Sequence, residues 1–117
     1  MAVTYNTVID QGADWYFVVT YENPAGTPVN ITSYTAALQL RSTPNTATYV
    51  LSLATGGNGI TINGAAGEVS IHATAAQTGA IDEGSYFYDL EITSPASPSV
   101  TTRLVQGQIV VSAQVTQ

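Results

Sequence analysis

The chain contains no cysteine and no lysine, and few of its residues are charged. Without cysteine it cannot form a disulfide, a thiolate metal site or a thiol nucleophile. Arg41 and Arg103 are the only cations among 117 residues, and the formal net charge is −6 at pH 7. Two cations cannot neutralise a run of phosphates, so we expect the chain to bind neither nucleic acid nor an anionic membrane surface.

Long apolar segments are also missing. No apolar run approaches the roughly 20 residues that a membrane-spanning helix needs. The opening MAVTYNTVID lacks the basic and apolar regions of a secretory signal. So weakly charged a surface suits permanent contact with other proteins, because interface cores are depleted in charge, and it suits a Thr-rich soluble β-domain equally well.

Apolar residues alternate with a period of two, and turn residues interrupt the pattern at short intervals. This pattern is typical of an all-β sandwich or barrel. We predict one domain, residues 1–117, folded as a single antiparallel β-sandwich of Ig-like or jelly-roll-like type with about eight strands. The predicted strands are Val3–Ile9, Asp14–Glu22, Tyr34–Arg41, Ala47–Leu53, Ile60–Ile62, Glu68–Ala73, Gly84–Ile92 and Val100–Val115.

Two local signals interrupt the strands. Thr74-Ala-Ala-Gln77 has the form of a capping box, in which two side chains satisfy backbone N–H groups at a helix start. Gly79 can end this helix, so we predict one short helical turn near residues 74–79. Gly107 inside the last strand predicts a bulge or bend.

Two acids, Asp89 and Glu91, alternate with apolar residues in GSYFYDLEI. A hairpin closed by residues 94–99 would place Leu90 opposite Leu104 and Glu91 opposite Arg103, which predicts a structural Glu91–Arg103 ion pair. Carboxylates two residues apart on a strand also lie at about the 6–7 Å spacing of an inverting glycosidase pair. That chemistry needs a desolvated carboxyl in a cleft, so the solvated strand face is the favoured interpretation.

No other constellation points to catalysis or metal binding. His72 is the single histidine, and transition-metal sites usually need three or four such ligands. Asp10, Asp14 and Glu22 lack the spacing of a calcium loop. The glycines at 56–59 lead into a strand, whereas a phosphate loop leads into a helix. We therefore expect no cofactor, no metal and no enzymatic activity.

Aromatic residues offer one further possibility. Trp15 and Tyr86 have the parity of core residues, whereas Tyr16 and Phe87 have the opposite parity. Tyr16 and Phe87 are therefore the candidate protein–protein interface residues. The four aromatics together could instead form a sugar-stacking platform.

The order of motifs resembles the N-terminal domain of phage baseplate upper proteins, a family of small β-sandwich proteins of tailed bacteriophages. Residues 23–34, NPAGTPVNITSY, are similar to the family's G-x-P-x-[D/N]-L-T-G-Y turn and strand entry, with Ser33 where glycine is common. The other matching segments are Ile9–Gly12, Ala37–Arg41, Gly59–Ile62, Gly67–Ile71, Gly84–Glu91, Leu104–Val111 and Val115-Thr116.

This resemblance implies a virion structural protein without an active site. It would join tail, baseplate or fibre components through protein–protein contacts, in multiple copies within a symmetric assembly of other virion proteins. The alternatives are a capsid decoration protein and a carbohydrate-binding module that contacts the host surface.

Overall fold

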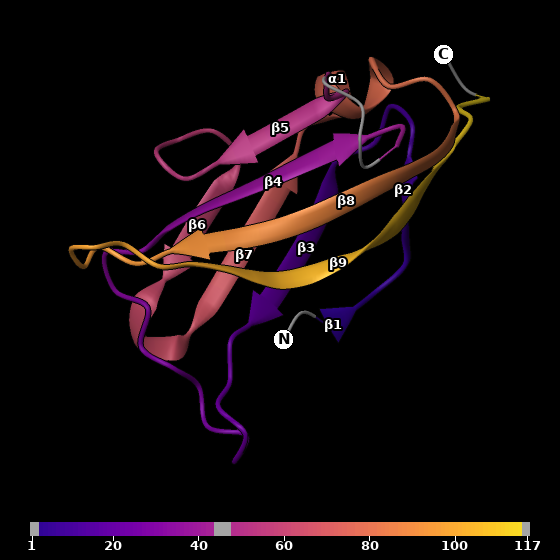
Figure 1. Ribbon diagram of the computed structural model, residues 1–117. Helices are drawn as coiled ribbons and strands as arrows, with labels where there is room; N and C mark the ends of the chain where they lie inside the picture. Colours follow the sequence, from indigo (N-terminus) through magenta and orange to yellow (C-terminus); the bar gives the residue numbers. More distant parts are fainter. Residues whose placement is uncertain (1–2, 44–47, 116–117) are drawn as a thin grey trace.

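The computed structural model describes residues 3–43 and 48–115, which fold into two packed β-sheets (Figure 1). The larger sheet has the order β1-β9-β8-β4-β5, with β2 also paired to β9, and the smaller sheet has the order β3-β7-β6. The predicted all-β sandwich is confirmed. The strands are β1 (Val3–Thr4), β2 (Thr7–Asp10), β3 (Trp15–Thr20), β4 (Thr35–Arg41), β5 (Leu51–Ala54), β6 (Ile60–Asn63), β7 (Glu68–Ala73), β8 (Gly84–Thr93) and β9 (Thr101–Ser112).

The N-terminal segment departs from the expected antiparallel pattern. The predicted strand Val3–Ile9 is divided into β1 and β2, and both pair with β9 in parallel. Between them, the Tyr5 N–H donates to the Gln106 carbonyl at 2.8 Å. The start of another predicted strand, Ala47, lies outside the described residues.

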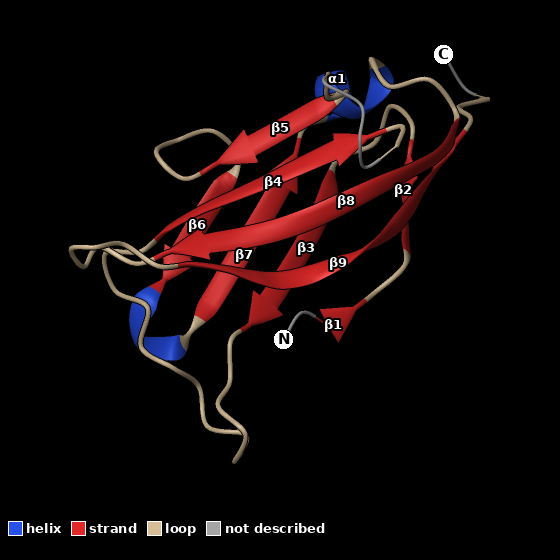
Figure 2. Ribbon diagram, in the orientation of Figure 1, coloured by secondary structure: helices blue, strands red, loops and turns tan. Residues whose placement is uncertain are grey.

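Helical structure is confined to short corners (Figure 2). The predicted helical turn is α1 (Ala75–Gly79), and its capping box is present, with the Thr74 and Gln77 side chains each bonded to backbone N–H groups. A 3₁₀ turn, η1 (Gly64–Ala66), joins β6 to β7. No helix of the described residues is long and apolar enough to cross a membrane.

Alternating apolar side chains from both sheets fill the core. Leu38 and Leu40 on β4 and Leu90 on β8 have no exposed surface. The predicted core aromatics Trp15 and Tyr86 are each 8% exposed, so their inward orientation is confirmed.

The β8–β9 hairpin forms as predicted, but its register differs in one place. Glu91 lies opposite Arg103, as expected, whereas Leu90 lies opposite Val105 and not opposite Leu104. The register shifts between Leu90 and Glu91, and the extra residue lies on β9. Leu104 and Val105 are consecutive yet both buried, which is the consequence of this bulge.

Gly107 is not the bulged residue, because the register shift lies earlier in β9, at Leu104. Gly107 instead allows two segments of the chain to approach each other closely. A Cβ atom at this position would collide with the Tyr5 carbonyl and with the Asn6 side chain. Asn6 also accepts a hydrogen bond from the Gln108 N–H at 2.9 Å. The missing side chain at 107 therefore lets the link between β1 and β2 lie against β9.

Candidate functional site

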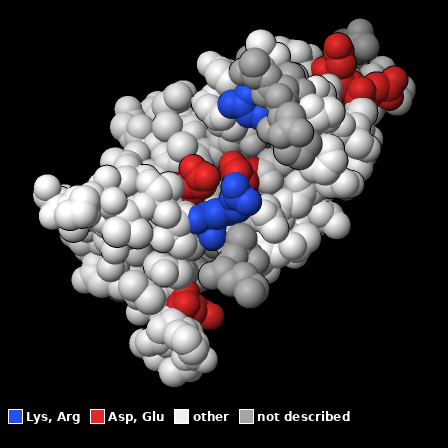
Figure 3. Space-filling model, in the orientation of Figure 1, with Lys and Arg blue, Asp and Glu red and all other residues white. Residues whose placement is uncertain are grey.

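Four of the chain's ten charged side chains gather on the outer face of the larger sheet (Figure 3). They line a hollow of about 430 Å³, which we call the charged hollow. Its lining residues are Gln39, Arg41, Phe87, Tyr88, Asp89, Glu91, Arg103, Gln106 and Gly107. Both arginines of the sequence are among them, so the hollow is the most charged feature of a weakly charged chain.

Strand register explains why these side chains meet. Asp89 on β8 lies opposite Gln39 on β4 and opposite Gln106 on β9. Phe87 lies opposite Arg41 on β4. Successive side chains alternate between the faces of a strand, so Phe87, Asp89 and Glu91 all point away from the core into which Tyr88 and Leu90 are packed.

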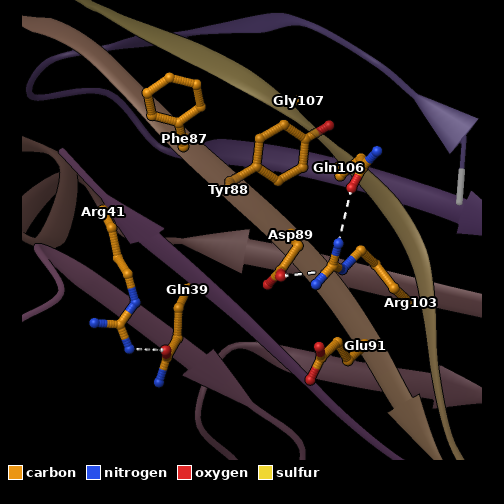
Figure 4. A pocket seen from close by; sticks show the side chains of 9 residues that line it. All are labelled: Gln39, Arg41, Phe87, Tyr88, Asp89, Glu91, Arg103, Gln106 and Gly107. Atoms are coloured by element: carbon orange, nitrogen blue, oxygen red, sulfur yellow. Dashed lines mark hydrogen bonds and ion pairs between the residues drawn. The ribbon is translucent and has the colours of Figure 1, made fainter. Parts of the chain in front are cut away.

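Arg103 forms its ion pair with Asp89, which corrects the predicted partner. The Arg103 Nε lies 3.3 Å from Asp89 Oδ2, and its Nη1 donates to Gln106 Oε1 at 3.0 Å (Figure 4). Glu91 stands directly opposite Arg103 in the ladder, but its carboxylate forms no hydrogen bond or ion pair with any residue that the structure describes. The guanidinium thus reaches diagonally, toward the side of the hollow where Gln106 can hold it.

The second arginine is also held by neighbours. Arg41 Nη2 donates to Gln39 Oε1 at 2.6 Å, and the Arg41 guanidinium lies 5.9 Å from the centre of the Tyr49 ring.

The catalytic acid of a glycosidase would have to be desolvated. Asp89 does not meet this requirement, because its side chain is 37% exposed and ion-paired with Arg103.

A second polar cluster lies on the outer face of the smaller sheet and joins residues far apart in the sequence. His72 Nε2 lies 2.9 Å from Asp14 Oδ2, and the His72 ring stacks on Tyr16 with a centroid distance of 4.4 Å. Asp14 Oδ1 accepts a hydrogen bond from the Ala75 N–H at 2.9 Å. The hydrogen bonds from His72 and Ala75 hold the pKa of Asp14 below its ordinary value.

Sequence reasoning missed the Asp14–His72 pair. The signal lies in the β3–β7 register, which pairs Tyr16 with His72 and places Asp14 just before β3, beside the start of α1. The cluster joins the residue before β3 to β7 and to the first residue of α1, so its role is structural. No group of three or more His, Cys, Asp or Glu side chains suited to a metal ion occurs among the residues that the structure describes.

An apolar groove of about 600 Å³ lies between the edge of β3 and the strands β1 and β9. Its lining residues are Val3, Tyr5, Phe17, Val18, Val19, Thr20, Tyr21, Glu22, Asn23, Leu104 and Val105. Val3, Tyr5 and Val18 are respectively 63%, 48% and 57% exposed. The described strands pair with β3 on one side only, through β7, so β3 is an edge strand beside this apolar groove.

Tyr5 forms part of the wall of the apolar groove. Its ring stacks on Phe17 with a centroid distance of 5.5 Å, and its carbonyl accepts a 2.6 Å hydrogen bond from the Tyr88 hydroxyl. Burial raises the pKa of Tyr88 to about 12. These contacts hold the N-terminal segment between β3 of the smaller sheet and β8 of the larger sheet.

The two predicted interface residues occupy different faces. Tyr16 is 69% exposed on the outer face of the smaller sheet, and Phe87 is 36% exposed in the charged hollow. They form no common patch, and neither lines the apolar groove.

Comparison of the chain with protein-family models and with curated proteins found no match. The apolar groove and the charged hollow are therefore interpreted from their own chemistry.

Proposed function

We propose that the chain is a non-enzymatic structural protein of a bacteriophage virion, and that it joins tail, baseplate or fibre components by protein–protein contacts. The phage setting comes from the resemblance of its motifs to those of baseplate upper proteins. No family match adds to it. The contact mode comes from the apolar groove, which is the observation that carries the proposal.

Apolar surface that remains exposed along a groove is typical of interaction sites. Val3 and Val18 have more than half of their surface exposed. The adjacent edge of β3 adds backbone N–H and C=O groups that no described strand pairs. A partner that supplies an extended apolar segment could bury the side chains and extend the smaller sheet at the same time.

The weakly charged surface is compatible with a place inside an assembly. Charged groups are depleted at interface cores because their desolvation is costly. Repeated copies of such a chain in a symmetric particle would each bury the same apolar groove against a neighbouring virion protein.

The experiment compares incorporation of two valine variants into purified particles of the encoding phage. Val18→Lys places a charge beside the apolar groove, and we expect the amount of chain per particle to fall at least about ten-fold. Val110→Lys is the matched control, because Val110 is also exposed but lies on β9 outside the apolar groove. It should leave incorporation unchanged.

Circular dichroism and thermal unfolding of the purified variants determine whether each still folds. Incorporation of folded Val18→Lys at the wild-type level would contradict the role of the apolar groove. Absence of the wild-type chain from particles would contradict the virion setting itself.

A further inference from the structure

The charge balance inside the charged hollow differs from that of the whole chain. Arg41 and Arg103 face Asp89 and Glu91, so the formal charge of the hollow is zero, whereas the chain carries −6. An anionic ligand would be attracted by the two guanidinium groups but repelled by the two carboxylates, and a cationic ligand would meet the reverse, so neither gains a net electrostatic attraction. A neutral ligand avoids both repulsions.

Hydrogen-bond donors and acceptors both line the charged hollow. Guanidinium groups only donate hydrogen bonds, carboxylates only accept them, and the amides of Gln39 and Gln106 do both. Each hydroxyl group is at once one donor and two acceptors. A polyhydroxylated molecule can therefore satisfy both kinds of group within one small area.

Glu91 is the group most clearly left for a ligand. Its side chain is half-buried, and no described residue bonds to its carboxylate. Arg103, the cation opposite it, is turned toward Asp89 and Gln106 (Figure 4). A half-buried carboxylate that no described residue contacts by a hydrogen bond gains most from a charged hydrogen bond to a ligand hydroxyl.

Phe87 supplies the apolar part of the charged hollow, at the end away from Glu91 (Figure 4). Its ring is 36% exposed. A pyranose ring has one face of C–H groups that can lie on an aromatic ring while its equatorial hydroxyls reach sideways to polar groups. The Phe87 ring and the polar groups of Asp89 and Glu91 lie on alternate positions of one strand, so a single ligand can contact them together.

The size of the charged hollow matches a small ligand. Three adjacent strands span about 10 Å, and positions four residues apart on a strand span about 13 Å. This area accommodates one or two sugar rings. The volume of about 430 Å³ falls within the usual range for small-molecule sites.

From these observations we infer that the charged hollow binds a neutral carbohydrate, with Glu91 and Asp89 accepting hydrogen bonds from its hydroxyls and Phe87 covering its apolar face. This inference concerns a different face from the apolar groove, and it holds or fails independently of the virion setting.

The test is a titration of isotope-labelled protein followed by backbone amide NMR. The probes are the neutral disaccharides maltose, cellobiose, lactose and N,N′-diacetylchitobiose, which are long enough to contact Phe87 and Glu91 together, each up to about 50 mM, with anionic N-acetylneuraminic acid and cationic choline for comparison. We expect at least one neutral sugar to shift signals of β4, β8 and β9 around the charged hollow, with saturation in the millimolar range. Failure of all four neutral sugars, shifts confined to other faces, or stronger binding of a charged probe would each overturn the inference.

Matched variants connect binding to the named side chains. Glu91→Gln and Phe87→Ala should each weaken binding about ten-fold. Glu68→Gln is the control for charge, because Glu68 is also half-buried on a strand and lies on the other sheet. Equal losses for Glu91→Gln and Glu68→Gln would overturn the inference, and thermal unfolding identifies any variant that fails to fold.

Discussion

Arg103 pairs with Asp89 at 3.3 Å although Glu91, and not Asp89, stands opposite it in the β8–β9 ladder. The register shift beside Glu91 and the hydrogen bond from Arg103 to Gln106 direct the guanidinium along the strand. Both charged side chains of this pair remain substantially exposed, at 50% for Arg103 and 37% for Asp89. Water therefore screens the pair, and its contribution to stability is small.

Removal of either carboxylate should accordingly have little effect on folding. We expect Asp89→Asn to lower the free energy of unfolding by less than about 1 kcal/mol, and Glu91→Gln to change it by less than about 0.5 kcal/mol. Urea denaturation measures both values. A larger cost for Glu91→Gln than for Asp89→Asn would show that Arg103 prefers its ladder partner in solution.

The Asp14–His72 cluster predicts a specific dependence of stability on acid. The pKa of Asp14 is lowered in the folded chain by hydrogen bonds from His72 and Ala75, so its contribution is present above its ordinary value of 3.8. It is lost as the pH falls through the lower pKa of the folded state, because protonation then removes the charged acceptor.

Asp14→Asn should therefore be less stable than the wild type at pH values above about 4, and the difference should shrink in stronger acid. Urea denaturation at a series of acidic pH values measures this difference. A difference that stays constant down to the lowest pH would contradict the electrostatic explanation. Asp82→Asn is a suitable control for the loss of one acid.

The Tyr88 hydroxyl predicts how firmly the N-terminal segment is held. Tyr88→Phe removes its hydrogen bond to the Tyr5 carbonyl and should cost about 1 kcal/mol. Hydrogen exchange of the Tyr5 N–H should become faster, because the segment that it belongs to is less restrained. Tyr86→Phe is the matched control, since the Tyr86 hydroxyl bonds to the Asp82 carbonyl instead. Equal acceleration at Tyr5 in both variants would contradict this assignment.

The same residue predicts a loss of stability in alkali. In the folded chain the pKa of Tyr88 is raised to about 12 from an ordinary 10.0. The unfolded chain therefore loses this proton first, so stability falls as the pH rises from about 10 toward 12. Urea denaturation over this range should show a shallower decline for Tyr88→Phe. An unchanged slope would mean that Tyr88 ionises normally in the folded state.

Ser33 predicts a stabilising substitution. It is the one non-glycine residue with positive φ within the described ranges, at 69°, and its side chain is exposed. The left-handed conformation costs an L-residue about 1 kcal/mol, and glycine avoids this cost. Glycine also raises the conformational entropy of the unfolded chain, which offsets part of the stabilisation. Ser33→Gly should raise the thermal midpoint slightly, whereas Ser70→Gly within β7 should lower it. A lower midpoint for Ser33→Gly would contradict this account.

Local patterns predicted much of this fold. Period-two alternation located the core side of β8, and the capping box located α1. The hairpin argument placed Glu91 opposite Arg103 correctly. Each of these features depends on residues close together in the sequence or on a single turn.

The features that the sequence did not reveal depend on long-range register. The parallel pairing of β1 and β2 with β9, the contact between Asp14 and His72, and the apolar groove all join segments far apart in the chain. The extra residue in β9 places Val105, and not Leu104, opposite Leu90. The sequence could not predict this shift, because both residues are apolar and the alternation pattern does not distinguish them. The apolar groove therefore depends on the packing of the two sheets, and the Asp14–His72 pair depends on the β3–β7 register.

The proposal that this chain is a phage virion protein is tested most directly by immunogold electron microscopy of purified phage particles, with antibody raised against the chain. The account predicts gold at the tail or at its tip. Gold over the head would instead identify a capsid decoration protein. Particles without gold, with the epitope shown to be accessible, would contradict the virion assignment.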